Sequence, residues 1–136
     1  METEAICGLA VPAISQTDSI LFLWATSPKL AEALRVMAKW GFTYRTCMVW
    51  VKDRIGMGRY ARQRHELLLI GAKGSLPTPA PEHRPDSVVE APRGTHSQKP
   101  ERFYEIIEVM YHNVSRIELF ARNARPGWSA WGDQKL

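Results

Sequence analysis

The sequence has 136 residues, 45% of them hydrophobic, which suffices for one buried core but not for two ordinary domains, so we expect a single domain over residues 1–136. The formal net charge of +4 is compatible with a polyanionic partner but does not identify one. We find neither a signal-peptide pattern nor an apolar run near the ~20 residues of a membrane span, so we expect a cytoplasmic protein without membrane contact.

The residues that commonly bind metals show no ligand spacing. Cys7 and Cys47 lie far apart, without a Cys-x-x-Cys motif or a paired histidine. The four histidines are not spaced as ligands either. We therefore expect two reduced, mostly buried thiols and no metal site.

The first elements alternate between helix and strand. Residues 3–9 give a weak helix signal. Residues 19–25 are a continuous apolar run, too short for a helix, which predicts a strand buried on both faces of a parallel sheet. Residues 27–41 predict an amphipathic helix that starts with a Ser-Pro pair and ends at a glycine. Its apolar face is predicted to consist of Leu30, Ala33, Leu34, Met37 and Ala38.

Two further strands are predicted before a long proline-rich segment. Residues 42–52 and 65–71 are rich in aromatic, aliphatic and β-branched side chains, which favours strands. Residues 74–94 contain five prolines and no helical period, a composition typical of a functional or a disordered loop. Within this loop only residues 87–90 resemble a strand.

The last part of the chain predicts a helix over residues 100–112, a strand over 117–121 and a short strand or turn over 126–132. The apolar face of this helix is predicted to consist of Phe103, Ile106, Ile107, Met110 and Tyr111. The order strand, helix, strand, strand, helix, strand predicts an α/β sandwich of Rossmann type.

Polar side chains that follow a strand or precede a helix are candidates for a ligand site, because ligands of open α/β sheets bind beyond the carboxyl ends of the strands. Lys99 precedes a helix, where a cation and free N–H groups together suit a carboxylate or a phosphate. Arg122 and Asn123 follow a strand, and Asp133 and Gln134 could hydrogen-bond ribose hydroxyls or a base edge. On spacing alone, solvated side chains are the favoured explanation.

A basic loop lies between the second and third strands. Its basic residues alternate with glycines and Tyr60, which would suit contact with phosphates, although a solvated surface explains them equally well. They are Lys52, Arg54, Arg59, Arg62 and Arg64. Elsewhere, Glu118 lies inside an apolar strand, and pairing with Arg116 on the same face is the simplest explanation.

Eight short segments follow one another along the chain: Leu21-Phe-Leu-Trp24, Trp40-Gly-Phe42, Val49-Trp-Val-Lys52, Gly56-Met-Gly58, His65-Glu-Leu-Leu-Leu69, His96-Ser-Gln-Lys-Pro100, Glu118-Leu-Phe-Ala-Arg122, and Pro126-Gly-Trp128 with Trp131-Gly132. Together they resemble, in register over about residues 3–134, the adenine-N6 methyltransferase family named after the seventy-kilodalton subunit of the mRNA adenosine methyltransferase. No single segment is decisive, but eight in this order are highly specific.

The resemblance implies a permuted Rossmann-like methyltransferase that uses S-adenosylmethionine to methylate the N6 amine of adenine in nucleic acid, with DNA favoured over RNA. By matching positions, Lys99 would contact the methionine part of the cofactor. Arg122, Asn123, Asp133 and Gln134 would lie around its carboxylate and ribose. The family usually has Asn in place of Asp133, and an aspartate accepts hydrogen bonds but does not donate them.

The family's strand that ends in Asp-Pro-Pro-Trp has no counterpart in this sequence. In the family the Asp carboxylate and a Pro carbonyl accept hydrogen bonds from the adenine amine, and the aromatic residue stacks on the flipped base. We therefore name no catalytic residue. The missing motif-four strand would lie between residues 20–25 and 117–121, so we expect open strand edges that invite a homodimer or a strand-donating partner.

Three interpretations remain open. The first is an adenine-N6 methyltransferase whose N-terminal strand is absent from this reading frame, in which case cofactor binding by this chain alone is predicted to be weak. The second is a non-catalytic nucleic-acid-binding or assembly subunit derived from such a methyltransferase. The third is a gene remnant without a role.

Overall fold

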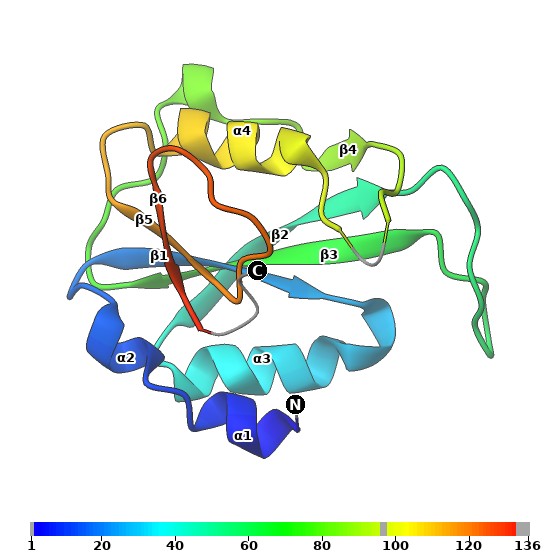
Figure 1. The fold of residues 1–136 in the computed structure, drawn as a ribbon, viewed down its shortest axis with the longest axis horizontal. Coiled ribbons are helices and arrows are strands. Elements are labelled where there is room, and N and C mark those ends of the chain that lie inside the picture. Colours follow the sequence, from blue (N-terminus) through cyan, green and yellow to red (C-terminus); the bar gives the residue numbers. More distant parts are fainter. Residues whose placement is uncertain (1, 96–97, 133–136) are drawn as a thin grey trace.

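Helices cover both faces of a mixed β-sheet (Figure 1). The computed structural model describes residues 2–95 and 98–132. The sheet forms the middle layer in Figure 1, with the first three helices below it and the last one above it. The helices are α1 (Thr3–Cys7), α2 (Val11–Ile14), α3 (Leu30–Lys39) and α4 (Glu101–Met110), with short 3-10 helices η1 (Ser27–Lys29) and η2 (Pro81–His83).

The main sheet has four strands in the order β1-β3-β2-β4. They are β1 (Ser19–Ala25), β2 (Thr43–Val51), β3 (His65–Lys73) and β4 (Val88–Glu90). β3 runs antiparallel to both of its neighbours, whereas β4 runs parallel to β2. The expected parallel sheet is therefore wrong in one respect: β1, β2 and β4 share a direction, but β3 is inserted between β1 and β2 in the opposite sense.

The reversed strand has a simple cause. β2 and β3 follow one another without a helix between them, and strands joined in this way most often pair antiparallel, because a parallel pair needs a connection that crosses over the sheet. The register places Ala25 opposite Leu67 and Val51 opposite His65. The carboxyl ends of β1, β2 and β4 therefore lie beside the start of β3 at the same end of the strands, which we call the carboxyl edge of the sheet.

The two faces of the sheet pack against different helices. One hydrophobic cluster includes Met37 of α3 and Leu69 of β3, and a second includes Phe103 of α4 and Leu68 of β3. Because Leu68 and Leu69 are successive residues and each is 1% exposed, β3 is the strand buried on both faces. The expectation that residues 19–25 would be buried on both faces is wrong, since β1 is an edge strand of partly buried side chains.

The buried face of α3 differs from the predicted one, whereas the apolar face of α4 lies as predicted. Leu34 and Ala38 are exposed, and Val36 and Trp40 are buried instead. Trp40 at the end of the helix donates from Nε1 to the carbonyl of Ile6, 3.0 Å away, which turns this face towards α1. Seven of the ten residues of α3 are apolar, which allows more than one apolar stripe, and the stripe that is buried contains Val36 and Met37.

A second, two-stranded sheet contains the C-terminal strands β5 (Arg116–Leu119) and β6 (Trp128–Trp131), which pair parallel. The loop between them begins at Phe120, whose φ of 57° lies in the left-handed region that few residues other than glycine adopt. Gly127, with φ of 83°, closes the same loop. These two positions let a short connection return the chain for a parallel pairing.

The proline-rich segment 74–94 has a defined path. It contains η2 and then β4, which confirms the strand predicted near residues 87–90. The segment is attached to β2 on both sides of β4, because Val49 N–H donates to the carbonyl of Ser87 at 2.7 Å and Ala91 N–H to that of Val51 at 3.1 Å. Among the described residues, no helix has the length and apolar character that crossing a bilayer requires.

The corrected face of α3 can be tested with a matched pair of variants. Met37 is 1% exposed and touches the backbone of β3 so closely that a Cβ on Gly71 would lie 2.7 Å from its sulfur. Met37→Ala should lower the free energy of unfolding by about 2–5 kcal/mol, because it opens a cavity. Leu34→Ala should lower it by less than about 1 kcal/mol, because Leu34 is already 36% exposed. Urea unfolding followed by circular dichroism measures both, and equal losses would contradict this face assignment.

Candidate functional site

The carboxyl edge of the main sheet brings together five side chains from separate parts of the sequence. Trp24 lies near the end of β1, Trp50 near the end of β2, and Lys52 directly after β2. Glu66 is the second residue of β3, and Lys99 comes from the segment that leads into α4. We call these five residues the edge cluster.

A buried carboxylate joins the two lysines of the edge cluster. The side chain of Glu66 is 8% exposed. Lys99 Nζ lies 2.5 Å from Glu66 Oε1, and Lys52 Nζ lies 3.1 Å from Glu66 Oε2. Each carboxylate oxygen therefore has its own ammonium partner, which meets the requirement that a buried charge be paired.

Two tryptophans form the walls around this ion-pair network. The Lys99 ammonium lies 5.1 Å from the centre of the Trp24 ring, and the Lys52 ammonium lies 4.9 Å from that of Trp50. The two rings meet edge to face, 5.8 Å apart. Cation–π contact of this kind adds stabilisation where the cation is partly desolvated. Trp50 also donates from Nε1 to the carbonyl of Ala91 at 2.7 Å. This hydrogen bond holds the residue after β4 against the site.

The edge cluster keeps Glu66 ionised. Burial by itself raises the pKa of the Glu66 carboxyl, but the hydrogen bonds and charges of Lys99 and Lys52 outweigh burial, so its pKa lies below the ordinary value. At neutral pH the site thus contains one carboxylate and two ammonium groups, with a net positive charge. Because an ammonium has three N–H donors, each lysine retains donors for an anionic or polar ligand.

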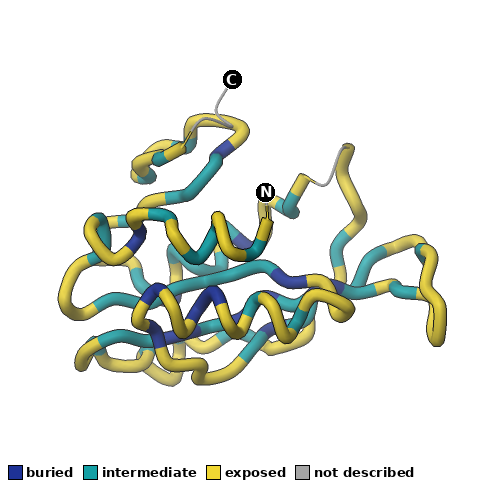
Figure 2. The backbone as a smooth tube through the Cα atoms, turned by 90° about the horizontal axis from the view of Figure 1, so that it is seen from below, coloured by how far each residue is buried: buried dark blue, intermediate teal, exposed yellow. Residues whose placement is uncertain are grey.

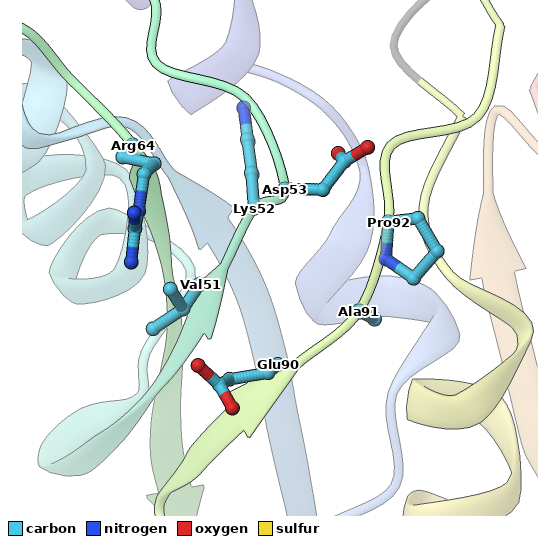
Figure 3. A pocket seen from close by; sticks show the side chains of 7 residues that line it. All are labelled: Val51, Lys52, Asp53, Arg64, Glu90, Ala91 and Pro92. Atoms are coloured by element: carbon cyan, nitrogen blue, oxygen red, sulfur yellow. The ribbon is translucent and has the colours of Figure 1, made fainter.

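A hollow of about 350 Å³ opens next to the edge cluster (Figure 3). It lies beyond the carboxyl ends of β2 and β4, and its lining includes Lys52, Asp53, Arg64 and Glu90. In Figure 3 the Glu90 carboxylate comes from the β4 side and Arg64 from the β3 side of this hollow. The Arg93 N–H donates to Asp53 Oδ1 at 2.9 Å, and this hydrogen bond lowers the pKa of the exposed Asp53 carboxyl. The hollow therefore offers charges of both signs.

The sequence-predicted cofactor residues fall into three groups. Lys99 belongs to the edge cluster. Arg122 and Asn123 are exposed in the loop between β5 and β6. Asp133 and Gln134 lie outside the described residues.

The predicted nucleic-acid residues divide as well. Lys52 points into the edge cluster and pairs with Glu66, whereas the four arginines of the loop are exposed. The exposed residues are Arg54, Arg59, Arg62 and Arg64.

Sequence reasoning selected Lys52 and Lys99 but missed Glu66 and its pairing with both lysines. A signal was present, since a glutamate at the start of an apolar run that enters the core needs a buried cation. The proposed pairing of Glu118 with Arg116 is wrong. Glu118 Oε2 accepts from the Tyr104 hydroxyl at 2.6 Å, while Arg116 donates to the carbonyl of Tyr111 at 2.9 Å. Burial and the Glu118 carboxylate both raise the pKa of the Tyr104 hydroxyl.

A second polar network fixes the loop that carries Arg122 and Asn123. Arg125 in this loop pairs with Glu101 and Glu108, both on α4. Trp128 donates from Nε1 to Glu108 Oε2 at 2.7 Å. We call Glu101, Glu108, Arg125 and Trp128 the α4 clamp, because it holds the start of β6 and the preceding loop against α4.

The ion pairs of the edge cluster give a pH-dependent prediction. Lys99→Met should lower the free energy of unfolding at pH 7 by about 2–3 kcal/mol, because it leaves a buried carboxylate with a single remaining lysine. The pKa of Glu66 is depressed in the folded state, so the stabilisation is present above its ordinary pKa of about 4.3 and is lost as pH falls through the lower folded value. The difference between parent and variant should therefore narrow below about pH 4.

Urea unfolding at pH 7 and at pH 3 measures this difference. Lys29→Met is the matched control, because Lys29 pairs with Glu32 on the surface and its side chain is 68% exposed. A loss for Lys99→Met that is the same at both pH values would rule out the ion pairs as its cause.

Comparison with known proteins identifies the family. The MT-A70 family profile matches residues 1–134. The chain is 39% identical over 133 residues to the type II methyltransferase M.MunI of Mycoplasma sp, an alignment that covers 97% of this chain. It is 31% identical over 144 residues to the N(6)-adenosine-methyltransferase MT-A70-like protein of Drosophila melanogaster, and 30% over 136 residues to the human N(6)-adenosine-methyltransferase catalytic subunit METTL3.

These relatives are longer than the chain. The matched region is 57% of M.MunI and 23% of each of the two animal proteins, while it covers 93–98% of the present sequence. The similarity therefore concerns one region of each relative, and within that region it extends over nearly all the elements described above. The chain belongs to the MT-A70 family of methyltransferases.

Proposed function

We propose that this chain forms one domain, residues 1–136, of an enzyme that transfers a methyl group from S-adenosylmethionine to the N6 amine of adenine in nucleic acid. The observation that carries the proposal is the match over nearly the whole chain to proteins named as methyltransferases, two of them as N6-adenosine methyltransferases. Between the two nucleic acids we favour DNA. Identity is higher to the type II methyltransferase than to the relatives whose names specify adenosine, the ribonucleoside.

The residues of this chain fit an anionic part of such a cofactor. Among the described residues Lys99 donates to Glu66 alone, which leaves it further N–H donors, and its partly buried ammonium strengthens a contact with a carboxylate. Arg122 and Asn123 supply further donors from the loop that the α4 clamp holds. When bound, S-adenosylmethionine supplies an electrophilic methyl group on a positively charged sulfur. Asp133 and Gln134 complete the set of residues proposed for its ribose.

The chain needs a further element for catalysis. The adenine amine is a weak nucleophile, so groups that accept its hydrogen bonds must align it with the methyl group. Asp-Pro-Pro-Trp, which supplies these acceptors in the family, is absent from the 136 residues. We propose a permuted Rossmann-like arrangement in which an additional strand carrying this segment pairs between β1 and β5. The position of β1 at the edge of its sheet and the separation of β5 into another sheet support this proposal.

One observation favours a second candidate function. The four exposed arginines of the loop between β2 and β3 fit a non-catalytic subunit that binds nucleic acid or assembles with a catalytic partner. The two candidates differ in one measurable property, because only the first predicts methyl transfer once the missing strand is supplied.

Methyl transfer tests the proposal directly. The chain, extended by the sequence encoded upstream of Met1, should transfer label from S-adenosylmethionine to adenine-containing DNA, and more slowly to RNA. Transfer to neither nucleic acid would contradict the first candidate and favour the second. The chain without the extension should bind the cofactor weakly by calorimetry, and tight binding would show that the additional strand is not needed.

Lys99 has a specific expected role in the extended protein. Lys99→Met should weaken cofactor binding roughly ten- to a hundredfold, the effect of losing a charge-assisted hydrogen bond. The control is again Lys29→Met, which should bind as the parent does. Calorimetry measures both, and unchanged binding by Lys99→Met would remove Lys99 from the proposed site.

The exposed arginines give a prediction on nucleic-acid binding. Replacing Arg54, Arg59, Arg62 and Arg64 with Ala should weaken binding to adenine-containing oligonucleotides. The slope of log affinity against log salt should also become shallower by about 3, because four phosphate contacts are lost. Fluorescence anisotropy at several salt concentrations measures this slope. The same affinity and slope in parent and variant would contradict a role for the loop in binding phosphates.

A further inference from the structure

The loop between β2 and β3 projects from the end of the sheet. In Figure 1 it extends to the right of the sheet, away from the helices, and Figure 2 shows its outer part as exposed. Backbone hydrogen bonds join its two sides. Lys52 N–H donates to the carbonyl of Arg64 at 2.8 Å, and Gly56 N–H donates to the carbonyl of Gln63 at 2.6 Å. The loop therefore continues the β2–β3 hairpin as a stalk beyond the end of the paired strands.

The turn at the tip is tight. A Cβ placed on Gly58 would lie 1.8 Å from the carbonyl oxygen of Ala61, so glycine alone permits this close approach. Arg62 Nε donates to the carbonyl of Gly56 at 3.3 Å and braces the same turn. The chain thus doubles back between Gly58 and Ala61, and Arg59 and Tyr60 occupy the apex.

The apex exposes large apolar side chains. Tyr60 is fully exposed and Met57 is 87% exposed, while Ile55 lower on the stalk is 51% exposed. A single exposed apolar residue is ordinary, but three in one short projection mark a contact surface. We call Ile55, Met57 and Tyr60 the tip residues.

The charges around the tip residues indicate the partner. From Lys52 to Arg64 the loop has five basic side chains and one carboxylate, that of Asp53. Lys52 and Asp53 are engaged at the base of the loop, with Glu66 and with the Arg93 N–H respectively. The outer loop thus combines arginines with an aromatic ring, the combination that binds nucleic acid by phosphate contact and base stacking. Two such loops from two copies of the chain would repel each other, which disfavours self-association through the tip.

We propose that Tyr60 stacks on an unpaired base of a nucleic acid whose backbone Arg59 and Arg62 contact. This inference rests on the proposed function, since it names the contact by which the domain holds its substrate strand. A ring at the apex of a stalk reaches a base that is exposed in a single strand or in an opened duplex. Every base has a π face, so this contact tolerates different sequences.

Binding to a single-stranded, adenine-containing oligonucleotide tests the proposal. The full chain is titrated at several salt concentrations and followed by fluorescence anisotropy. Tyr60→Ala should weaken binding between about five- and a hundredfold, the usual effect of removing a stacked base contact, with the salt slope unchanged. Tyr60→Phe keeps the ring and should bind within about twofold of the parent. Arg59→Ala should instead make the slope shallower by about 1.

The outcomes separate this inference from the proposed function. If the parent binds with a strong salt dependence and Tyr60→Ala binds equally well, the stacking contact is wrong while nucleic-acid binding stands. If the parent does not bind oligonucleotides at all, nucleic-acid binding fails and the stacking contact fails with it. If Tyr60→Ala changes the sedimentation of the free protein instead of its affinity for the oligonucleotide, the tip residues bind another copy of the chain, which also overturns the proposal.

Discussion

The pairing of one buried carboxylate with two lysines organises the carboxyl edge of this sheet. Glu66 lies on β3 with its side chain buried, where an unpaired charge would be costly. Lys52 and Lys99 must therefore lie next to its carboxylate in the folded state. Lys52 directly follows β2, the strand beside β3, but Lys99 lies far along the chain, before α4. The ion pair with Lys99 therefore attaches the C-terminal part of the molecule to the sheet, and it does so at the place where open α/β sheets bind ligands.

The reversed direction of β3 explains why a carboxylate reaches that edge. In a strand parallel to β1 and β2, the edge would receive the last residues of the strand. Because β3 runs the other way, its second residue is presented there. The direct connection from β2 that reverses β3 is also the loop that projects beyond the sheet with four arginines and Tyr60. A single topological feature thus supplies both the interior charge pattern of the candidate site and the exposed loop next to it.

Much of the fold was predictable from periodicity, and most of the site was not. The apolar face of α4 and the strand near Val89 follow from local pattern, because each signal lies within a few residues. The buried face of α3 does not follow from local pattern. Trp40 is buried and Leu34 is exposed, and Trp40 is hydrogen-bonded to the carbonyl of Ile6, which is remote in sequence. Lys99 could be selected by its position before a helix, but its partner Glu66 depends on strand direction. Likewise, Glu118 binds Tyr104 across two elements, a contact that spacing within β5 does not specify.

The α4 clamp constrains the length of a helix as well as its sequence. Glu101 and Glu108 are seven positions apart, about two helical turns, so both face Arg125 from one side of α4. Lys99 stands just before the same helix, and Arg122 stands in the loop that the clamp holds. An insertion of one residue within α4 would rotate Glu108 by about 100° away from Arg125 while leaving Lys99 in place. Among homologous domains, α4 should therefore vary in composition more readily than in length, since it sets the spacing between the two parts of the candidate cofactor site.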